Sequence, residues 1–154
     1  MYECIYPNPI QLQNSINMIG DSIESEKKDA QFYQWLIDNI PSSLSSNQAK
    51  QIKSIIESIR NDELNHNKMF QNMYHQLTGN IVTPIDEEFI PPESFKVGIT
   101  DALMGELEAV KKYRLIMSGL PSLYYRDIVF NILTDELRHA SLYNYIFANL
   151  YNLV

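Results

Sequence analysis

The chain has 154 residues, of which 19 are acidic and 12 are basic, and its formal net charge is −7. This length is typical of one domain, and the acidic balance without a run of Lys or Arg argues against a nucleic-acid partner. No apolar run approaches the roughly 20 residues that cross a bilayer, and no signal-peptide pattern begins the chain, so no membrane association is expected. These features predict a cytoplasmic protein with a single domain over residues 1–154.

Long helices are predicted because the chain has only five glycines and its prolines lie at ends and connections. Apolar residues recur at alternating steps of three and four, as expected for helices that bury one face. In chain order, the expected helices cover about residues 10–40, 45–77, 94–118 and 121–152. Pro41, Thr78-Gly79 and Gly119 follow the first three, and Pro121 is a residue type favoured in a first helical turn.

The connections between these helices predict how they are arranged. Residues 41–44 and 119–121 are short links, which make antiparallel neighbours. The middle link, 78–92, has fifteen residues and reaches about 50 Å when extended, at ~3.3 Å per residue. It can therefore run along a helix of about 45 Å. The pattern predicts an all-α fold: an antiparallel four-helix bundle with a long crossover between the second and third helices.

The two halves of the chain also resemble each other, which indicates a repeated helical hairpin. Two groups of residues recur with identical spacing: Glu26, Tyr33 and Pro41 as Glu106, Tyr113 and Pro121, and Asp62-Glu63-Leu64-Asn65-His66 as Asp135-Glu136-Leu137-Arg138-His139.

Polar residues interrupt the apolar stripe of every predicted helix at one level. Four carboxylates in one core layer would repel one another strongly, and burying even one without a partner is costly. Two divalent cations would balance four carboxylates and leave the imidazoles neutral. The pattern therefore predicts a two-metal site, with an ordinary buried polar network as the alternative. The predicted ligands are Glu26, Glu63, His66, Glu106, Glu136 and His139.

At these residues the chain resembles the ferritin-like superfamily, and within it the rubrerythrin-type di-iron carboxylate proteins. The resemblance covers about residues 11–150. It implies that each His binds one metal, that Glu63 and Glu136 bridge the pair, and that Glu26 and Glu106 each bind one metal. The chain has one cysteine, Cys4, so it lacks the four-cysteine rubredoxin domain of rubrerythrins.

The same resemblance implies a function. We expect a non-haem oxidoreductase that acts on dioxygen or hydrogen peroxide, as a peroxidase or ferroxidase, with a separate electron-donor protein. The expected cofactor is two Fe ions; Mn or a mixed Fe/Mn pair is the alternative, and Zn is a substitute. Ala109 stands where rubrerythrins carry an additional Glu, so their peroxidase switch is not expected. A metal-sequestering protein without turnover and a manganese catalase-like enzyme remain alternatives, and a homodimer is the expected assembly.

Further residues are expected to support the metal ligands. A metal-bound His usually donates its other N–H to a carboxylate, and in the family the Asp before the motif Glu has this part. This assigns Asp62, Asp135 and Arg138 to the surroundings of the site, with a solvated surface as the alternative for both Asp. Tyr33 and Tyr113 follow a ligand Glu by two turns, and hydrogen bonding, redox chemistry and core packing are all open to them.

Overall fold

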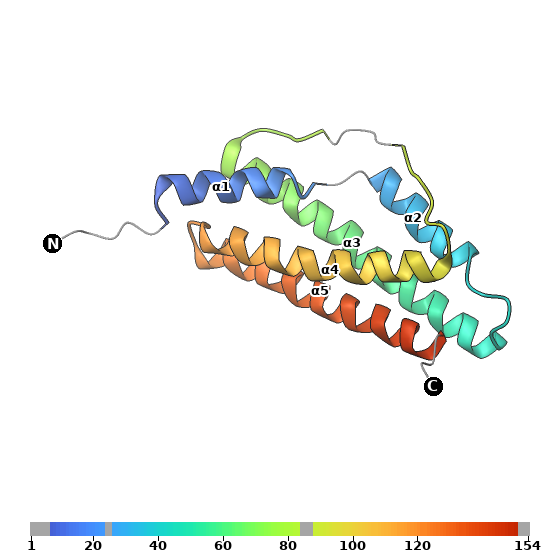
Figure 1. The fold of residues 1–154 in the computed structure, drawn as a ribbon. Helices are drawn as coiled ribbons and strands as arrows, with labels where there is room; N and C mark the ends of the chain where they lie inside the picture. Colours follow the sequence, from blue (N-terminus) through green and yellow to red (C-terminus); the bar gives the residue numbers. More distant parts are fainter. Residues whose placement is uncertain (1–6, 24–25, 84–87, 151–154) are drawn as a thin grey trace.

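The computed structural model describes residues 7–23, 26–83 and 88–150, and it excludes the side chains of Glu26 and Lys27. Within these ranges the chain has five helices and no strand, which confirms the all-α class (Figure 1). No described helix is long and apolar enough to span a membrane. The helices are α1 (Pro9–Gly20), α2 (Glu26–Asp38), α3 (Ser46–Thr78), α4 (Phe95–Ser118) and α5 (Leu123–Leu150).

The prediction of one helix over residues 10–40 is wrong, because α1 ends at Gly20 and α2 begins at Glu26. The amides of Ser22 and Ile23 bond to the carbonyls three residues earlier, so the helix tightens into a turn. The Ser22 hydroxyl also donates to the Met18 carbonyl at 2.7 Å. The sequence Gly20-Asp21-Ser22 favours such local hydrogen bonds over a continuous helix. The apolar periodicity continues across this segment, so it did not predict the break.

The other helix ends lie within two residues of their predicted positions. Ser45 caps α3 by accepting a hydrogen bond from the Gln48 amide, and the Gln48 side chain accepts one from the Ser45 amide in return. Gly79 ends α3 with φ 73°, a left-handed conformation that glycine adopts readily. Ser94 caps α4, and α5 begins at Leu123 rather than at Pro121.

The helices pack in a closed ring. Both α1 and α2 pack on α3 and α4, while α3 and α4 each pack on α5. The backbones of α3 and α4 do not approach each other within the described residues, so these two helices lie diagonally across the ring. Figure 1 shows α1 and α2 following each other along one side, and α3 and α4 running in the same direction.

The core consists of two apolar clusters separated by a polar layer. The first cluster joins α1 to the C-terminal half of α3, around Ile19, Phe70 and Ile132. The second joins α2 to the N-terminal half of α3, around Leu36, Ile56 and Ile146. Between them are the buried polar side chains of His66, Glu106, Glu136 and His139. The fold thus places these ionisable groups at the centre of the ring, far from either end.

Candidate metal centre

Four ligand-type side chains from three helices converge in this polar layer. Glu63 of α3, Glu106 of α4, and Glu136 and His139 of α5 each offer one ligand atom, and these atoms lie within 4.8 Å of one another. The carboxylate of Glu136 is 1% exposed and the ring of His139 is fully buried. The three-residue step from Glu136 to His139 places both on one face of α5, which is why both point into the ring.

His66 joins this group from α3. Its Nδ1 atom lies 3.2 Å from Oε1 of Glu136 and 3.6 Å from Oε2 of Glu63. Nδ1 of His139 lies 2.8 Å from Oε1 of Glu63 and 3.3 Å from Oε2 of Glu136. The two imidazole rings are stacked, with centroids 5.9 Å apart. Glu63 and Glu136 therefore each contact both histidines. A carboxylate in such a position could bridge two ions.

The outward-facing nitrogens of the two histidines contact aspartates in a crossed arrangement. Nε2 of His66 on α3 lies 3.1 Å from Asp135 on α5, and Nε2 of His139 on α5 lies 3.2 Å from Asp62 on α3. Each Asp thus holds the histidine of the opposite helix rather than the one that follows it in sequence. When Nε2 carries the proton that is shared with the Asp, the Nδ1 lone pair faces the centre, ready for a metal.

A single arginine serves both aspartates. The Arg138 guanidinium contacts Asp62, and it lies 3.3 Å from Asp135. The first motif has Asn65 where the second has Arg138, but the crossed packing of α3 and α5 lets one cation neutralise both carboxylates. The nearby Arg138 and His139 keep the pKa of Asp62 below its usual value although burial opposes this, so Asp62 stays an ionised acceptor.

Electrostatics show how the chain without metal accommodates this cluster. Burial would lower the pKa of His139, but Glu106, Glu136 and Glu63 raise it to about 12. Glu136 and Glu63 likewise raise the pKa of His66 to about 10 against the effect of burial. Burial and the adjacent carboxylates raise the pKa of Glu106 to about 9. The metal-free cluster therefore binds protons on its histidines and on Glu106, which supply the positive charge or the neutrality that bound cations would otherwise provide.

Buried atoms without a hydrogen bond are a second sign that these residues could hold a pair of metal ions. Three buried atoms that face the centre make no hydrogen bond: Oε1 of Glu63, Oε1 of Glu136 and Nδ1 of His66. They lie close to neighbouring ligand atoms without the alignment that a hydrogen bond requires. Buried polar atoms are rarely left unsatisfied, and the exceptions call for a reason. Carboxylate oxygens, and an imidazole nitrogen once it has released its proton, are suitable donors for a hard or borderline cation.

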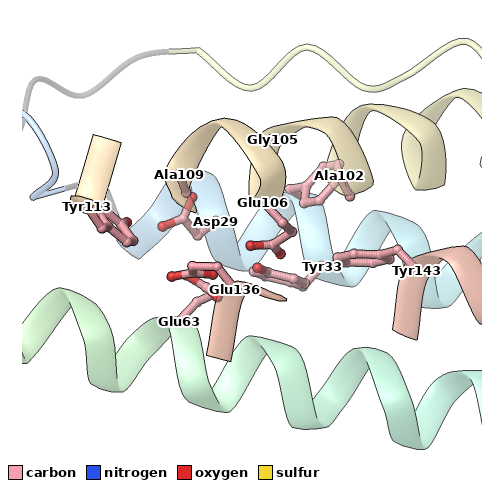
Figure 2. A pocket seen from close by; sticks show the side chains of 11 residues that line it. Asp29, Tyr33, Glu63, Ala102, Gly105, Glu106, Ala109, Tyr113, Glu136 and Tyr143 are labelled. Carbon is pink, nitrogen blue, oxygen red and sulfur yellow. The ribbon is translucent and has the colours of Figure 1, made fainter. Parts of the chain in front are cut away.

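A cavity of about 220 Å³ opens beside the cluster between α2 and α4. Figure 2 shows Asp29, Glu63, Glu106 and Glu136 entering it from different helices. Its α4 wall includes three small residues, Ala102, Gly105 and Ala109, and a Cβ added at Gly105 would meet nothing within 4 Å. A small molecule therefore has space to reach the carboxylates directly.

Tyrosines also line this cavity. Tyr33 and Tyr113, singled out in the sequence, are both buried; Tyr113 also packs on Phe70, with ring centroids 5.1 Å apart. Tyr143 on α5 is fully buried beside Tyr33. Burial first, and then the neighbouring tyrosine and carboxylates, raise the pKa of Tyr33 well above 10. Burial also raises the pKa of Tyr143, so Tyr33 and Tyr143 are neutral phenols at the cavity wall.

Two of these residues were missed by sequence reasoning. Asp29 lines the cavity although Glu26, one turn earlier, was the expected ligand. Tyr143 follows His139 by one turn and was not among the expected site residues. In both cases the helical spacing was a usable signal. Glu26 begins α2, but its side chain lies outside the described part of the structure, as does Cys4.

Comparisons with known proteins give one relative. No protein-family model matches the chain, and no solved structure matches it. The chain is similar to a Bacillus subtilis (strain 168) protein described as "Uncharacterized protein YhjR", with 26% identity over 143 residues. The match covers 91% of this chain and 93% of that protein, so the two are similar over nearly their full lengths.

Proposed function

We propose that this chain is a dinuclear metal protein of the rubrerythrin type, with two Fe ions as its cofactor. In this proposal the fold is a ferritin-like four-helix bundle, in which α1 and α2 together stand for the first helix. The closed ring of helices and the parallel course of α3 and α4 support that interpretation. Both are expected for two helical hairpins joined by one long crossover.

The observation that carries the proposal is the convergence of Glu63, Glu106, Glu136 and His139 within 4.8 Å, next to His66. An ordinary polar network would satisfy its own buried atoms, whereas three inward atoms here make no hydrogen bond. Glu106, Glu136 and His139 would hold one ion, and His66 would bind the other, with Glu63 and Glu136 shared. The carboxylate-rich donor set suits iron or manganese, which would supply redox chemistry between the +2 and +3 states.

Turnover, rather than sequestration alone, is supported by the cavity. The space of about 220 Å³ against three of the proposed ligands is many times larger than the roughly 10–15 Å³ that one water molecule needs. Such a space admits a small oxidant, dioxygen or peroxide, and the Tyr33 and Tyr143 phenols at its wall can donate hydrogen bonds to it. We therefore propose an oxidoreductase that receives electrons from a separate donor protein.

Metal content tests the site. We expect the purified, reconstituted protein to hold about two ions per chain, and we expect Glu63→Ala and Glu136→Ala to lose at least one of them, because both carboxylates contact both histidines. Glu57→Ala is the matched control on α3, since the Glu57 side chain is 40% exposed and lies 3.9 Å from the Lys53 ammonium. Elemental analysis that finds both ions retained in both site variants would show that the site is assigned wrongly.

Reaction with peroxide separates the functional alternatives. The anaerobic ferrous protein is mixed with hydrogen peroxide and a reductant, and absorption is followed over time. Repeated oxidation and reduction supports the oxidoreductase, whereas one stoichiometric oxidation without recovery supports a sequestering protein. Oxygen release from peroxide by protein that contains manganese would instead support a catalase-like enzyme.

A further inference from the structure

The two halves of the site differ at one position. Asp29 lies one turn after Glu26 on α2, and its counterpart one turn after Glu106 on α4 is Ala109. The repeat therefore breaks its own symmetry inside the polar layer, with a carboxylate on the α2 side and a methyl group on the α4 side. Figure 2 shows Asp29 and Ala109 both facing the cavity that Glu106 and Glu136 enter.

Asp29 also lines a second, much smaller cavity. This cavity of about 20 Å³ is bounded by three ligand-type side chains, Asp29, Glu63 and His66. A space of this size holds about one water molecule or ion, since roughly 10–15 Å³ is the minimum for a water. The tight group of four ligand atoms lies around His139 and does not include His66 or Asp29.

The His66 side chain is the independent sign that an ion belongs there. It is 4% exposed, its Nε2 is held by Asp135, and its Nδ1 faces the layer without a hydrogen bond. Oε1 of Glu136, also without a hydrogen bond, lies 3.2 Å from this Nδ1, and Oε2 of Glu63 lies 3.6 Å from it. A cation bound by these three atoms still needs a terminal carboxylate from α2. Asp29 is the described α2 residue that lines both cavities and so lies where they meet.

We propose that Asp29 is a metal ligand that completes the ion position next to His66. This inference rests on the proposed two-metal function and changes its ligand set. The ion next to His66 is bound by Asp29 and enclosed by the small cavity. The ion next to His139 faces the large cavity, because Ala109 provides no second carboxylate there. The site is thus asymmetric, and exchange with solvent and small molecules occurs at the His139 side.

Titration with Co²⁺ tests this without any catalytic readout. Visible absorption of Co²⁺ reports its coordination, and elemental analysis gives the number of ions bound. We expect wild type to bind two Co²⁺ per chain, and Asp29→Asn to keep the tighter ion and bind the second at least tenfold more weakly. Asp29→Glu restores the carboxylate and should recover much of that affinity. Asp38→Asn, an exposed position on the same helix, should match wild type.

The outcomes separate the inference from the proposed function. If wild type binds two ions and Asp29→Asn binds both with unchanged affinity and spectrum, Asp29 is not a ligand, and the two-metal proposal stands. The inference also fails if Glu26→Gln loses the second ion while Asp29→Asn keeps it. If wild type binds no Co²⁺, the two-metal function itself is wrong. Circular dichroism of each variant confirms that lost binding is not lost folding.

Discussion

At the scale of single residues, the site depends on which nitrogen of each histidine faces the centre. Asp62 and Asp135 decide this, because each accepts a hydrogen bond from Nε2 of the histidine on the opposite helix. This leaves both Nδ1 atoms directed at the carboxylates. The arrangement also couples α3 to α5, because each helix carries one of the two histidines and the aspartate that contacts the other histidine. A shift of either helix would therefore disturb the contacts of both histidines.

Replacing these aspartates should weaken metal binding without removing a ligand. We expect Asp62→Asn and Asp135→Asn each to lower metal affinity by about 10–100-fold, the range typical for groups that orient a ligating histidine. Competition with a chelator of known affinity measures the effect. Asp101→Asn on α4 provides the exposed control. Unchanged affinity in both site variants would show that the crossed contacts do not orient the histidines.

At the scale of helices, the break between α1 and α2 lets each segment pack on its own apolar cluster. α1 approaches the end of α4 so closely that a Cβ at Gly119 would lie 2.2 Å from the Gln11 carbonyl oxygen and 2.3 Å from Oγ of Ser15. The Ser15 hydroxyl donates to the Ile116 carbonyl at 2.8 Å. This contact fixes α1 against α4, and only glycine allows it.

Substituting Gly119 should therefore destabilise the fold. We expect Gly119→Ala to lower the free energy of unfolding by about 1–3 kcal/mol, as overpacking typically does. Gly105→Ala is the opposite case, because its Cβ would meet nothing within 4 Å. In mid-helix that change should stabilise by about 0.5–1 kcal/mol. Urea denaturation measures both, and equal effects would mean that α1 is free to move away from α4.

At the scale of the whole molecule, the polar layer divides the core and interrupts its apolar packing. Buried carboxylates and histidines separate the two apolar clusters. The metal-free cluster compensates by binding protons, as the raised pKa values of His66, His139 and Glu106 show. The predicted homodimer stays a prediction; the exposed Met104, Leu115 and Phe130 on α4 and α5 are the apolar side chains it would have to cover.

Metal binding should consequently stabilise the entire fold. At a free metal concentration of 100 times Kd the gain is about 2.7 kcal/mol, which corresponds to a rise in Tm of roughly 5–10 °C for a chain of this size. We expect this rise on anaerobic addition of Fe²⁺ and its reversal by a chelator, both followed by circular dichroism. The same addition should leave Glu63→Ala and Glu136→Ala nearly unchanged; an equal rise in these variants would indicate binding elsewhere.

The sequence by itself determined the all-α class, most helix ends and the polar layer. Periodic apolar residues, glycines and caps act within a few residues of one another, so they are legible along the chain. The spacing of Glu63 with His66 and of Glu136 with His139 placed each pair on one helical face, and the structure brings both pairs together with Glu106.

Only the tertiary structure decided what depends on contacts between helices. The crossed pairing of Asp62 and Asp135 and the single Arg138 that serves both aspartates arise from the packing of one helix on another. Asp29 and Tyr143 belong to the site for the same reason, because they line a cavity that exists only where several helices meet. Helical spacing gives the face on which a side chain lies, but the neighbouring helices decide what that face meets.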